Sequence, residues 1–147
     1  MVIVNYSGND EAADRTVKNI LDANGKAEKY KCQVDSYEET EKMITYIMDK
    51  YKRIDILINN AGVGYYGLHE ELNAAKIKEI VRTNFEAPMI LSQLALRQLK
   101  KSKGFIINIS SVTALQPSPH GCAYGASKAG LTAFSRSLFD EARKYGV

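Results

Sequence analysis

A tyrosine and a lysine four residues apart are the side chains of this sequence best suited to chemistry. They bound the segment Tyr124-Gly-Ala-Ser-Lys128, and positions i and i+4 of a helix share one face with Cβ atoms about 5–6 Å apart. A neighbouring ammonium stabilises a phenolate, because an opposite charge favours the ionised form. The pair predicts a proton donor and acceptor for general acid–base chemistry. Taken alone, this spacing more often marks an exposed Tyr–Lys contact that has no chemical role.

A serine hydroxyl is expected close to this pair. Ser111 directly follows an apolar, β-branched run over 105–110, and one loop separates it from Tyr124. That loop is long enough to return the chain to the same edge of a sheet, which would let the hydroxyl hold a substrate oxygen beside the phenol. The alternative is a serine that only caps a loop.

Glycines and short amides follow another apolar run, at 54–59. In Asn59-Asn-Ala-Gly62, two amides stand at the end of a predicted strand, where open α/β sheets bind ligands. Asn60 can tie down neighbouring loops, and Ala61 and Gly62 would let a flat cofactor approach the backbone. The alternative is a plain turn.

The neighbouring segment Gly62-Val-Gly-Tyr-Tyr-Gly67 matches the pattern G-x-G-x-x-G. A dinucleotide-binding fingerprint opens a helix directly, and an acidic residue ends the following strand. Here the next helix is expected only from Asn73, and the next strand ends in serines. We interpret this segment as a glycine loop.

The elements that must position these residues alternate along the chain. Strands are expected over 2–6, 54–59 and 105–110 from their apolar and β-branched residues, and a further strand is expected over 27–34. Helices are expected from an Asp10 cap to residue 24, from a Ser36–Glu39 capping box, from Asn73 to Lys101, and from Cys122 to Tyr145. This alternation predicts an α/β fold with a parallel sheet and helices on both faces, in a single domain over 1–147.

Composition excludes several classes of protein. Apolar residues make up 45% and charged residues 25% of the 147 residues, and the net charge is +3, which is typical of a globular chain without a nucleic-acid patch. No apolar run reaches the roughly 20 residues that cross a bilayer, and no signal peptide is evident. The two cysteines lack metal-site spacing. We expect a cytoplasmic protein with no metal, no nucleic acid and no membrane partner.

Three motifs together carry a resemblance to a known family. N-N-A-G at 59–62, N-I-S-S at 108–111 and Y-G-A-S-K at 124–128 occur in this order, and over the whole chain they resemble the short-chain dehydrogenase/reductase family. The resemblance implies a Rossmann-type, doubly wound parallel sheet. It also implies hydride transfer between NAD(P) and a carbonyl or alcohol without a metal.

The same resemblance implies roles for four residues. Tyr124 corresponds to the catalytic acid/base, Ser111 to the residue that orients the substrate, and Lys128 to the residue that binds the nicotinamide ribose and stabilises the phenolate. Asn84 corresponds to a fourth catalytic residue, whose backbone carbonyl holds a relay water. Pro88 supports this from the sequence, because it has no N–H to bond to the carbonyl of residue 84. The alternative is a kinked helix with a surface asparagine.

The sequence also departs from the family pattern. The family's pyrophosphate loop, TGxxxGxG, its strand, the substrate lid and the later strands are absent, so we expect a chain truncated at both ends with a gap at the sheet centre. Gln33 and Val34 stand where the family contacts adenine. The strand over 2–6 ends without a carboxylate for the ribose 2′-hydroxyl, which weakly favours NADP(H) over NAD(H).

Two hypotheses of function follow. In the first, the complete protein is an oxidoreductase of a small carbonyl/alcohol pair, and the family implies a homodimer or homotetramer formed through the two long helices. In the second, the chain is a truncated, non-catalytic dinucleotide-binding or structural remnant. A hydrolase using Ser111 and His120 is disfavoured, because no G-x-S-x-G elbow is present.

Overall fold

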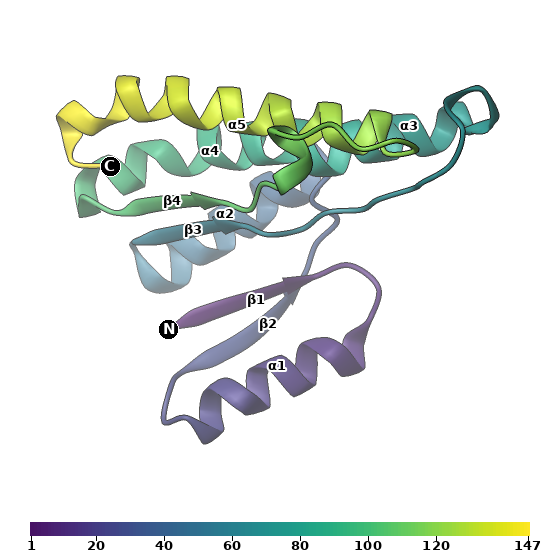
Figure 1. The fold of residues 1–147 in the computed structure, drawn as a ribbon. Helices are drawn as coiled ribbons and strands as arrows, with labels where there is room; N and C mark the ends of the chain where they lie inside the picture. The colour runs from purple at the N-terminus through teal and green to yellow at the C-terminus, as the bar shows by residue number, and fades with distance from the viewer.

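The computed structural model describes residues 1–147 and alternates strands with helices (Figure 1). The strands are β1 (Val2–Tyr6), β2 (Ala27–Lys31), β3 (Ile56–Asn59) and β4 (Phe105–Asn108). The α-helices are α1 (Asp10–Asp22), α2 (Tyr37–Tyr51), α3 (Ala74–Val81), α4 (Ala87–Ser102) and α5 (Cys122–Ala142). A π-helical segment, Arg82–Glu86, joins α3 to α4, and short 3-10 turns span His69–Glu71, Val112–Ala114 and Arg143–Tyr145.

The strands pair in parallel, which confirms the predicted α/β class. β1 pairs with β2 from Val2↔Ala27 to Tyr6↔Lys31, and β3 pairs with β4 from Ile56↔Phe105 to Asn59↔Asn108. The strands form two pairs rather than one sheet, since no strand connects β1 to β3. The gap lies where the sequence predicted it, between the strand that opens the chain and the strand that precedes the N-N-A-G segment.

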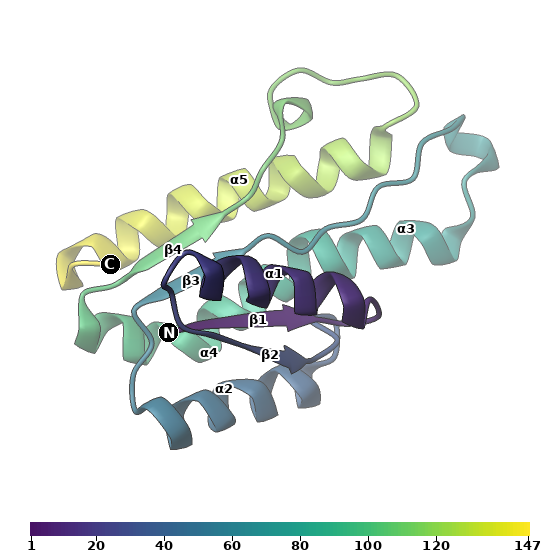
Figure 2. The ribbon, with the colours of Figure 1, turned by 90° about the horizontal axis from the view of Figure 1, so that it is seen from below.

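Helices cover the two strand pairs unequally (Figures 1 and 2). Helices α4 and α5 lie along one side of β3 and β4, while α1 lies along β1 and β2. The opposite side of the β3–β4 pair carries Ile56, Ile58, Phe105 and Ile107, which are all exposed. The apolar run over 54–59 predicted a strand buried on both faces. That prediction is wrong for this face, because no element covers it.

Helix α2 links the strand pairs through two apolar clusters. Cys32, after β2, packs with Met43 of α2 and Leu91 of α4. Further along α2, Ile44, Ile47 and Met48 pack against a cluster of Ile54, Ala95 and Leu99. The apolar face expected for the helix that follows Ser36 is therefore confirmed, and it holds β2 beside α4.

The first helix begins one residue earlier than expected. Asn9, not Asp10, is its cap, because the Asn9 side chain accepts a hydrogen bond of 2.8 Å from the Ala12 N–H. At the other end, Asn24 adopts the left-handed conformation with φ of 59°. Gly25 itself does not adopt the left-handed conformation. Glycine is needed there for space, since a Cβ would lie 2.6 Å from Cγ2 of Ile20.

The predicted capping box of α2 forms only in part. The Ser36 hydroxyl accepts from the Glu39 N–H at 3.3 Å, but the Glu39 carboxylate accepts from the Gln33 N–H at 2.7 Å. β2 ends at Lys31 instead of continuing to Val34, as the sequence predicted, because its partner β1 ends at Tyr6.

The helix expected from Asn73 to Lys101 is interrupted. Asn73 caps it as predicted, accepting from the Ala75 N–H at 2.7 Å, and the helical path reaches Ser102. The π-helical segment over 82–86 lies just before Pro88. Proline lacks an N–H and its ring crowds the preceding turn, which favours a wider turn at this point. None of the helices in the structure combines the length and apolarity needed to cross a lipid bilayer.

Candidate active site

Tyr124 and Lys128 lie in the first turns of α5 and face the same side. The Nζ of Lys128 is 5.9 Å from the centroid of the Tyr124 ring, so the predicted arrangement of the two side chains is present. The ring of Tyr124 is half-buried, whereas Lys128 is only 4% exposed. A phenol that reaches solvent and an ammonium that does not are therefore side by side.

Lys128 is held without a carboxylate. Its Nζ donates a hydrogen bond of 2.7 Å to the backbone carbonyl of Ile109, and it takes part in no salt bridge. Burial lowers the pKa of Lys128 below its ordinary value of 10.5. A buried, unpaired ammonium destabilises a fold, so its presence beside Tyr124 points to a chemical role.

The side chain of Asn84 connects the loop after β3 to α5. Asn84 is fully buried in the π-helical segment. Its Oδ1 accepts from the Val63 N–H at 2.8 Å, and its Nδ2 donates to the Val63 carbonyl at 2.8 Å and to the Ser127 hydroxyl at 3.2 Å. The alternative prediction, in which Asn84 is a surface residue of a kinked helix, is therefore wrong. The sequence analysis considered only the backbone carbonyl of Asn84 and missed these side-chain bonds.

Ser127 is a further residue that the sequence analysis missed. It is buried, and its hydroxyl donates to the Tyr124 carbonyl at 2.7 Å while accepting from Asn84. The signal was available, because Ser127 is the only hydroxyl between the tyrosine and the lysine. A buried hydroxyl at that position needs a partner, and Asn84 is that partner.

Glycines bring the loop after β3 close to these side chains. A Cβ at Gly62 would lie 3.4 Å from Oδ1 of Asn84 and 3.5 Å from Nζ of Lys128. A Cβ at Gly64 would lie 3.5 Å from Cδ2 of Tyr124. The segment over 62–67 does not open a helix, since a 3-10 turn follows it and α3 begins only at Ala74. Its interpretation as a glycine loop is confirmed.

Ser111 caps the 3-10 turn over Val112–Ala114 and also lies near α5. Its Oγ accepts from the Thr113 N–H at 3.2 Å and from the Thr113 hydroxyl at 2.9 Å. The turn reaches α5 beside Tyr124, because a Cβ at Gly125 would lie 3.4 Å from the Thr113 carbonyl oxygen. A hydroxyl has two acceptor positions and one donor. Both acceptor positions are used, and the Ser111 O–H remains able to donate.

Asparagines also tie the ends of β3 and β4 together. Asn59 and Asn108 are paired across the two strands, and Nδ2 of Asn59 donates to Oδ1 of Asn108 at 2.7 Å. Nδ2 of Asn108 in turn donates to the Ser135 hydroxyl of α5 at 2.7 Å. Oδ1 of Asn59 is buried without a partner. Asn108 was not predicted as a site residue. Its hydrogen bonds fix β4, and therefore Ser111, relative to α5.

The remaining predicted cofactor contacts are spread along the edge where the strands end. Asn60 and Ala61 are exposed in the loop that leads to Gly62. Gln33 and Val34 follow β2, on the other side of the gap between the strand pairs. The Gln33 side chain is exposed, while Val34 packs against the Cys32 cluster. The structure brings Gly62, Asn84, Tyr124 and Lys128 together and leaves Gln33 and Val34 with the other pair.

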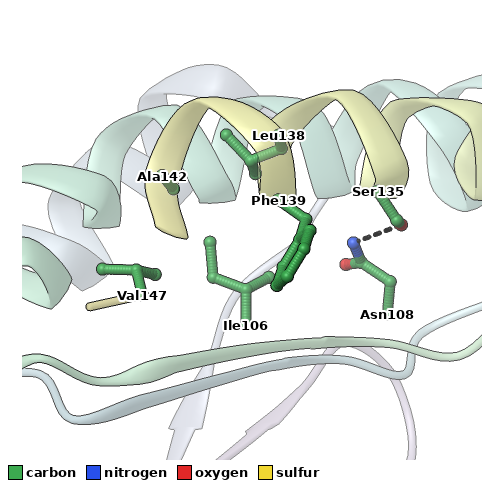
Figure 3. A pocket seen from close by; sticks show the side chains of 7 residues that line it. All are labelled: Ile106, Asn108, Ser135, Leu138, Phe139, Ala142 and Val147. Atoms are coloured by element: carbon green, nitrogen blue, oxygen red, sulfur yellow. Dashed lines mark hydrogen bonds between the residues drawn. The ribbon is translucent and has the colours of Figure 1, made fainter. Parts of the chain in front are cut away.

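A separate hollow of about 150 Å³ lies between β4 and the end of α5 (Figure 3). Ile106, Phe139 and Val147 give it an apolar lining, and the Asn108–Ser135 hydrogen bond closes one side. Tyr124 lies at the opposite end of α5, so this hollow is distinct from the group around Lys128.

Comparisons with known proteins agree with the motifs. The family described as short chain dehydrogenase matches residues 1–147. A 3-oxoacyl-(acyl-carrier-protein) reductase of Synechocystis sp. is 31% identical over 147 residues, covering 99% of this chain and 60% of the relative. A sorbitol-6-phosphate 2-dehydrogenase of Klebsiella pneumoniae is 36% identical over 124 residues, covering 78% of this chain and 46% of the relative. The chain spans about half the length of the curated relatives it matches.

Solved structures match the fold closely. The crystal structure of a metagenomic short-chain oxidoreductase in complex with NADP has a TM-score of 0.92 and 30% identity, covering 98% of this chain and 66% of that chain. A short-chain dehydrogenase from Streptomyces avermitilis has a TM-score of 0.90 and 28% identity, covering 99% of this chain and 53% of that chain. The match over residues 1–147 means that this chain belongs to the short-chain dehydrogenase/reductase family.

Proposed function

We propose that the protein is an NAD(P)-dependent oxidoreductase that interconverts a carbonyl and an alcohol, with Tyr124 transferring the proton. The observation that carries the proposal is the buried ammonium of Lys128, which has no carboxylate partner and lies 5.9 Å from the Tyr124 ring. Such a cation stabilises a phenolate. Because the chain spans about half the length of its curated relatives, the proposal concerns the product of the complete gene.

The residues around Lys128 fit one end of a nicotinamide cofactor. An ammonium has three donors, and the bond to Ile109 uses one of them, which leaves two for the hydroxyls of a ribose. Gly62 leaves open the space between Lys128 and Asn84 that a side chain would fill. When bound, the cofactor supplies or accepts the hydride. The glycine loop over 62–67 does not open a helix whose N-terminus could hold its pyrophosphate.

The side chains of the site divide the remaining tasks. In the reduction, the Tyr124 hydroxyl donates its proton to the oxygen of the substrate, and the Ser111 O–H, whose acceptor positions are filled by Thr113, orients that oxygen. Lys128 stabilises the phenolate that remains. Asn84 holds the glycine loop against α5, and its backbone carbonyl, opposite the missing N–H of Pro88, accepts from a relay water.

NADP(H) is the cofactor we propose over NAD(H). β1 ends at Tyr6 without a carboxylate that would repel a 2′-phosphate. The nearby carboxylate of Asp10 forms a salt bridge of 2.9 Å with Lys29. A related short-chain oxidoreductase, 30% identical to this chain, was crystallised with NADP. Fluorescence titrations with NADPH and NADH measure this preference, and tighter binding of NADH contradicts it.

Replacing Tyr124 with phenylalanine tests the proposed function in the full gene product. Loss of a general acid costs about 10²–10⁴-fold in turnover, so Tyr124→Phe should lose carbonyl reduction to that extent while NADPH still binds. Tyr145→Phe, at an exposed tyrosine beyond the end of α5, serves as the control and should keep full activity. A Tyr124→Phe enzyme that retains most of its turnover contradicts the assignment.

The proposal includes a homodimer or homotetramer formed through α4 and α5. Phe139 of α5 is 60% exposed, and an exposed large apolar side chain on a helix favours an interface. Gel filtration of the full gene product should give a mass at least twice that of one chain. A monomer contradicts this part of the proposal.

A further inference from the structure

The ring of Tyr66 is packed beside Tyr124 between two glycines. The centroids of the two tyrosine rings are 5.8 Å apart, with planes tilted by 48°. A Cβ at Gly64 would lie 3.3 Å from Cε2 of Tyr66, and a Cβ at Gly121 would lie 3.4 Å from Cε1. Neither glycine has a positive φ. Both glycines therefore let their loops approach the Tyr66 ring closely, and neither is needed for a left-handed backbone.

Two loops hold this ring in place. The loop after β3 carries Tyr66, and the loop before α5 carries Gly121, which is buried. A hydrogen bond of 3.0 Å from the Gly67 N–H to the His120 carbonyl joins the loops, and His120 adopts φ of 63° to make the turn. Although fixed on these sides, the Tyr66 side chain remains 63% exposed. The ring thus offers a positioned aromatic surface next to the proposed proton donor.

Other apolar side chains are exposed on the turn that follows Ser111. Val112 and Leu115 follow Ser111 and are 79% and 73% exposed. Their turn touches α5 at Gly125, the residue after Tyr124. Exposed large apolar groups gathered near a site indicate a binding surface for an apolar ligand. Two features therefore adjoin the first turns of α5: the Tyr66 ring beside Tyr124, and the turn after Ser111, which touches Gly125 and carries exposed apolar side chains.

The nearest cation along the loop is directed elsewhere. Lys76 of α3 lies over the ring of Tyr65, with Nζ 4.4 Å from the centroid, and the Tyr65 hydroxyl donates to Glu79 at 2.8 Å. Recognition of a phosphate or carboxylate needs a charged or strongly polar donor. Tyr66, Val112 and Leu115 carry no charged group, so the charge of an anionic substituent on the substrate would not be compensated by these three side chains.

We propose that Tyr66 determines specificity by packing against an aryl substituent of the substrate carbonyl, and that the site selects neutral aryl carbonyls over anionic ones. Aromatic pairs at centroid distances of about 4.5–7 Å are favourable beyond their buried area, and the ring is already held at such a distance from the reacting phenol. The inference rests on the proposed function, because it places the carbonyl of the substrate at Tyr124.

Kinetics of the full gene product with NADPH test the inference on three ketones: acetophenone, butanone and acetoacetate. The wild type should have its highest kcat/KM with acetophenone and its lowest with acetoacetate. Tyr66→Ala should lower kcat/KM about tenfold for acetophenone and less than twofold for butanone, since stacking and apolar contact are lost only with the aryl group. Tyr66→Phe keeps the ring and should behave as the wild type. Equal losses on all ketones, or none, overturn the inference.

A binding measurement separates this inference from the proposed function. 1-Phenylethanol should bind to the NADP⁺ complex of the wild type and of Tyr124→Phe, as seen in saturation-transfer NMR, and bind about tenfold more weakly to Tyr66→Ala. If no ketone is reduced by the wild type, the proposed function fails, while this measurement still decides the role of Tyr66. Unchanged binding by a Tyr66→Ala protein with the melting temperature of the wild type overturns it.

Discussion

The two strand pairs use polar residues in opposite ways. The β1–α1–β2 region keeps its charges at the surface, where Lys29 lies 2.9 Å from Asp10 and 2.7 Å from Asp14. The β3–β4 region and its helices instead bury polar side chains, which are Asn59, Asn84, Ser92, Ser127 and Lys128. Apart from Thr40 of α2, which bonds to its own helix, every fully buried polar residue belongs to this second region. In the first region, Oδ1 of the partly buried Asn5 is also shielded from solvent.

This contrast has a physical meaning. Surface ion pairs contribute little and are screened by salt, so those of the first region can change without loss of the fold. A buried polar group destabilises unless it is hydrogen-bonded, and the buried amides of the second region bond to loops that reach the site. A concentration of buried polar side chains therefore indicates where the molecule holds its chemistry.

The largest expected effect compares two glycines, one in each region. A Cβ at Gly104, between α4 and β4, would overlap the carbonyl oxygen of Asp55 and lie 3.0 Å from Cδ2 of Leu99. Gly104→Ala should lower the free energy of unfolding by about 3 kcal/mol or more, because backbone must move. Gly8→Ala, with no atom within 4 Å, should change it by less than about 0.5 kcal/mol. Urea denaturation of both variants measures the difference, and similar midpoints contradict it.

A smaller effect compares two asparagines. Asn84→Ala removes three hydrogen bonds of a buried side chain and should cost about 2–3 kcal/mol of stability. It should also lower turnover, because the glycine loop is released from α5. Asn9→Ala removes the exposed cap of α1 and should cost about 1 kcal/mol without affecting turnover. Equal stability losses, or an unchanged rate for Asn84→Ala, would show that burial does not separate the two regions.

The smallest effect compares two lysines and has a defined pH dependence. Lys128→Met removes a buried ammonium without a carboxylate partner and should raise stability at neutral pH by about 1 kcal/mol, while abolishing the proposed activity. Lys29→Met, in contrast, breaks exposed ion pairs, and the small loss it causes should disappear in high salt.

The sign of the pH effect follows from the lowered pKa of Lys128. Between this pKa and the ordinary value of 10.5, the unfolded wild type binds more protons than the native state, so wild-type stability rises with pH. The advantage of Lys128→Met should therefore shrink as pH increases toward 10.5. Urea denaturation of both proteins from pH 7 to 10.5 measures this trend, and a constant or growing advantage contradicts it.

Local patterns were sufficient for much of the architecture. Apolar β-branched runs located β1, β3 and β4, and the caps at Ser36 and Asn73 located two helix starts, because such features depend on residues a few positions apart. The spacing of Tyr124 and Lys128 fixed their common side of α5 for the same reason. One error was also local: Asn9 and Asp10 are both good caps, and the backbone conformation decided between them.

Contacts between distant segments were decided only by the tertiary structure. The bonds of Asn84 to Val63, of Asn59 to Asn108 and of Ser127 to Asn84 join residues that no sequence period relates. The placement of Tyr66 between Gly64 and Gly121 likewise depends on two loops meeting. The amino-acid sequence determined which residues are suited to the proposed chemistry, since residue type and short spacing suffice for that. The contacts between loops and helices depended on the packing of the whole chain. A buried polar group can form a hydrogen bond with any segment that the fold brings beside it, however distant in the sequence.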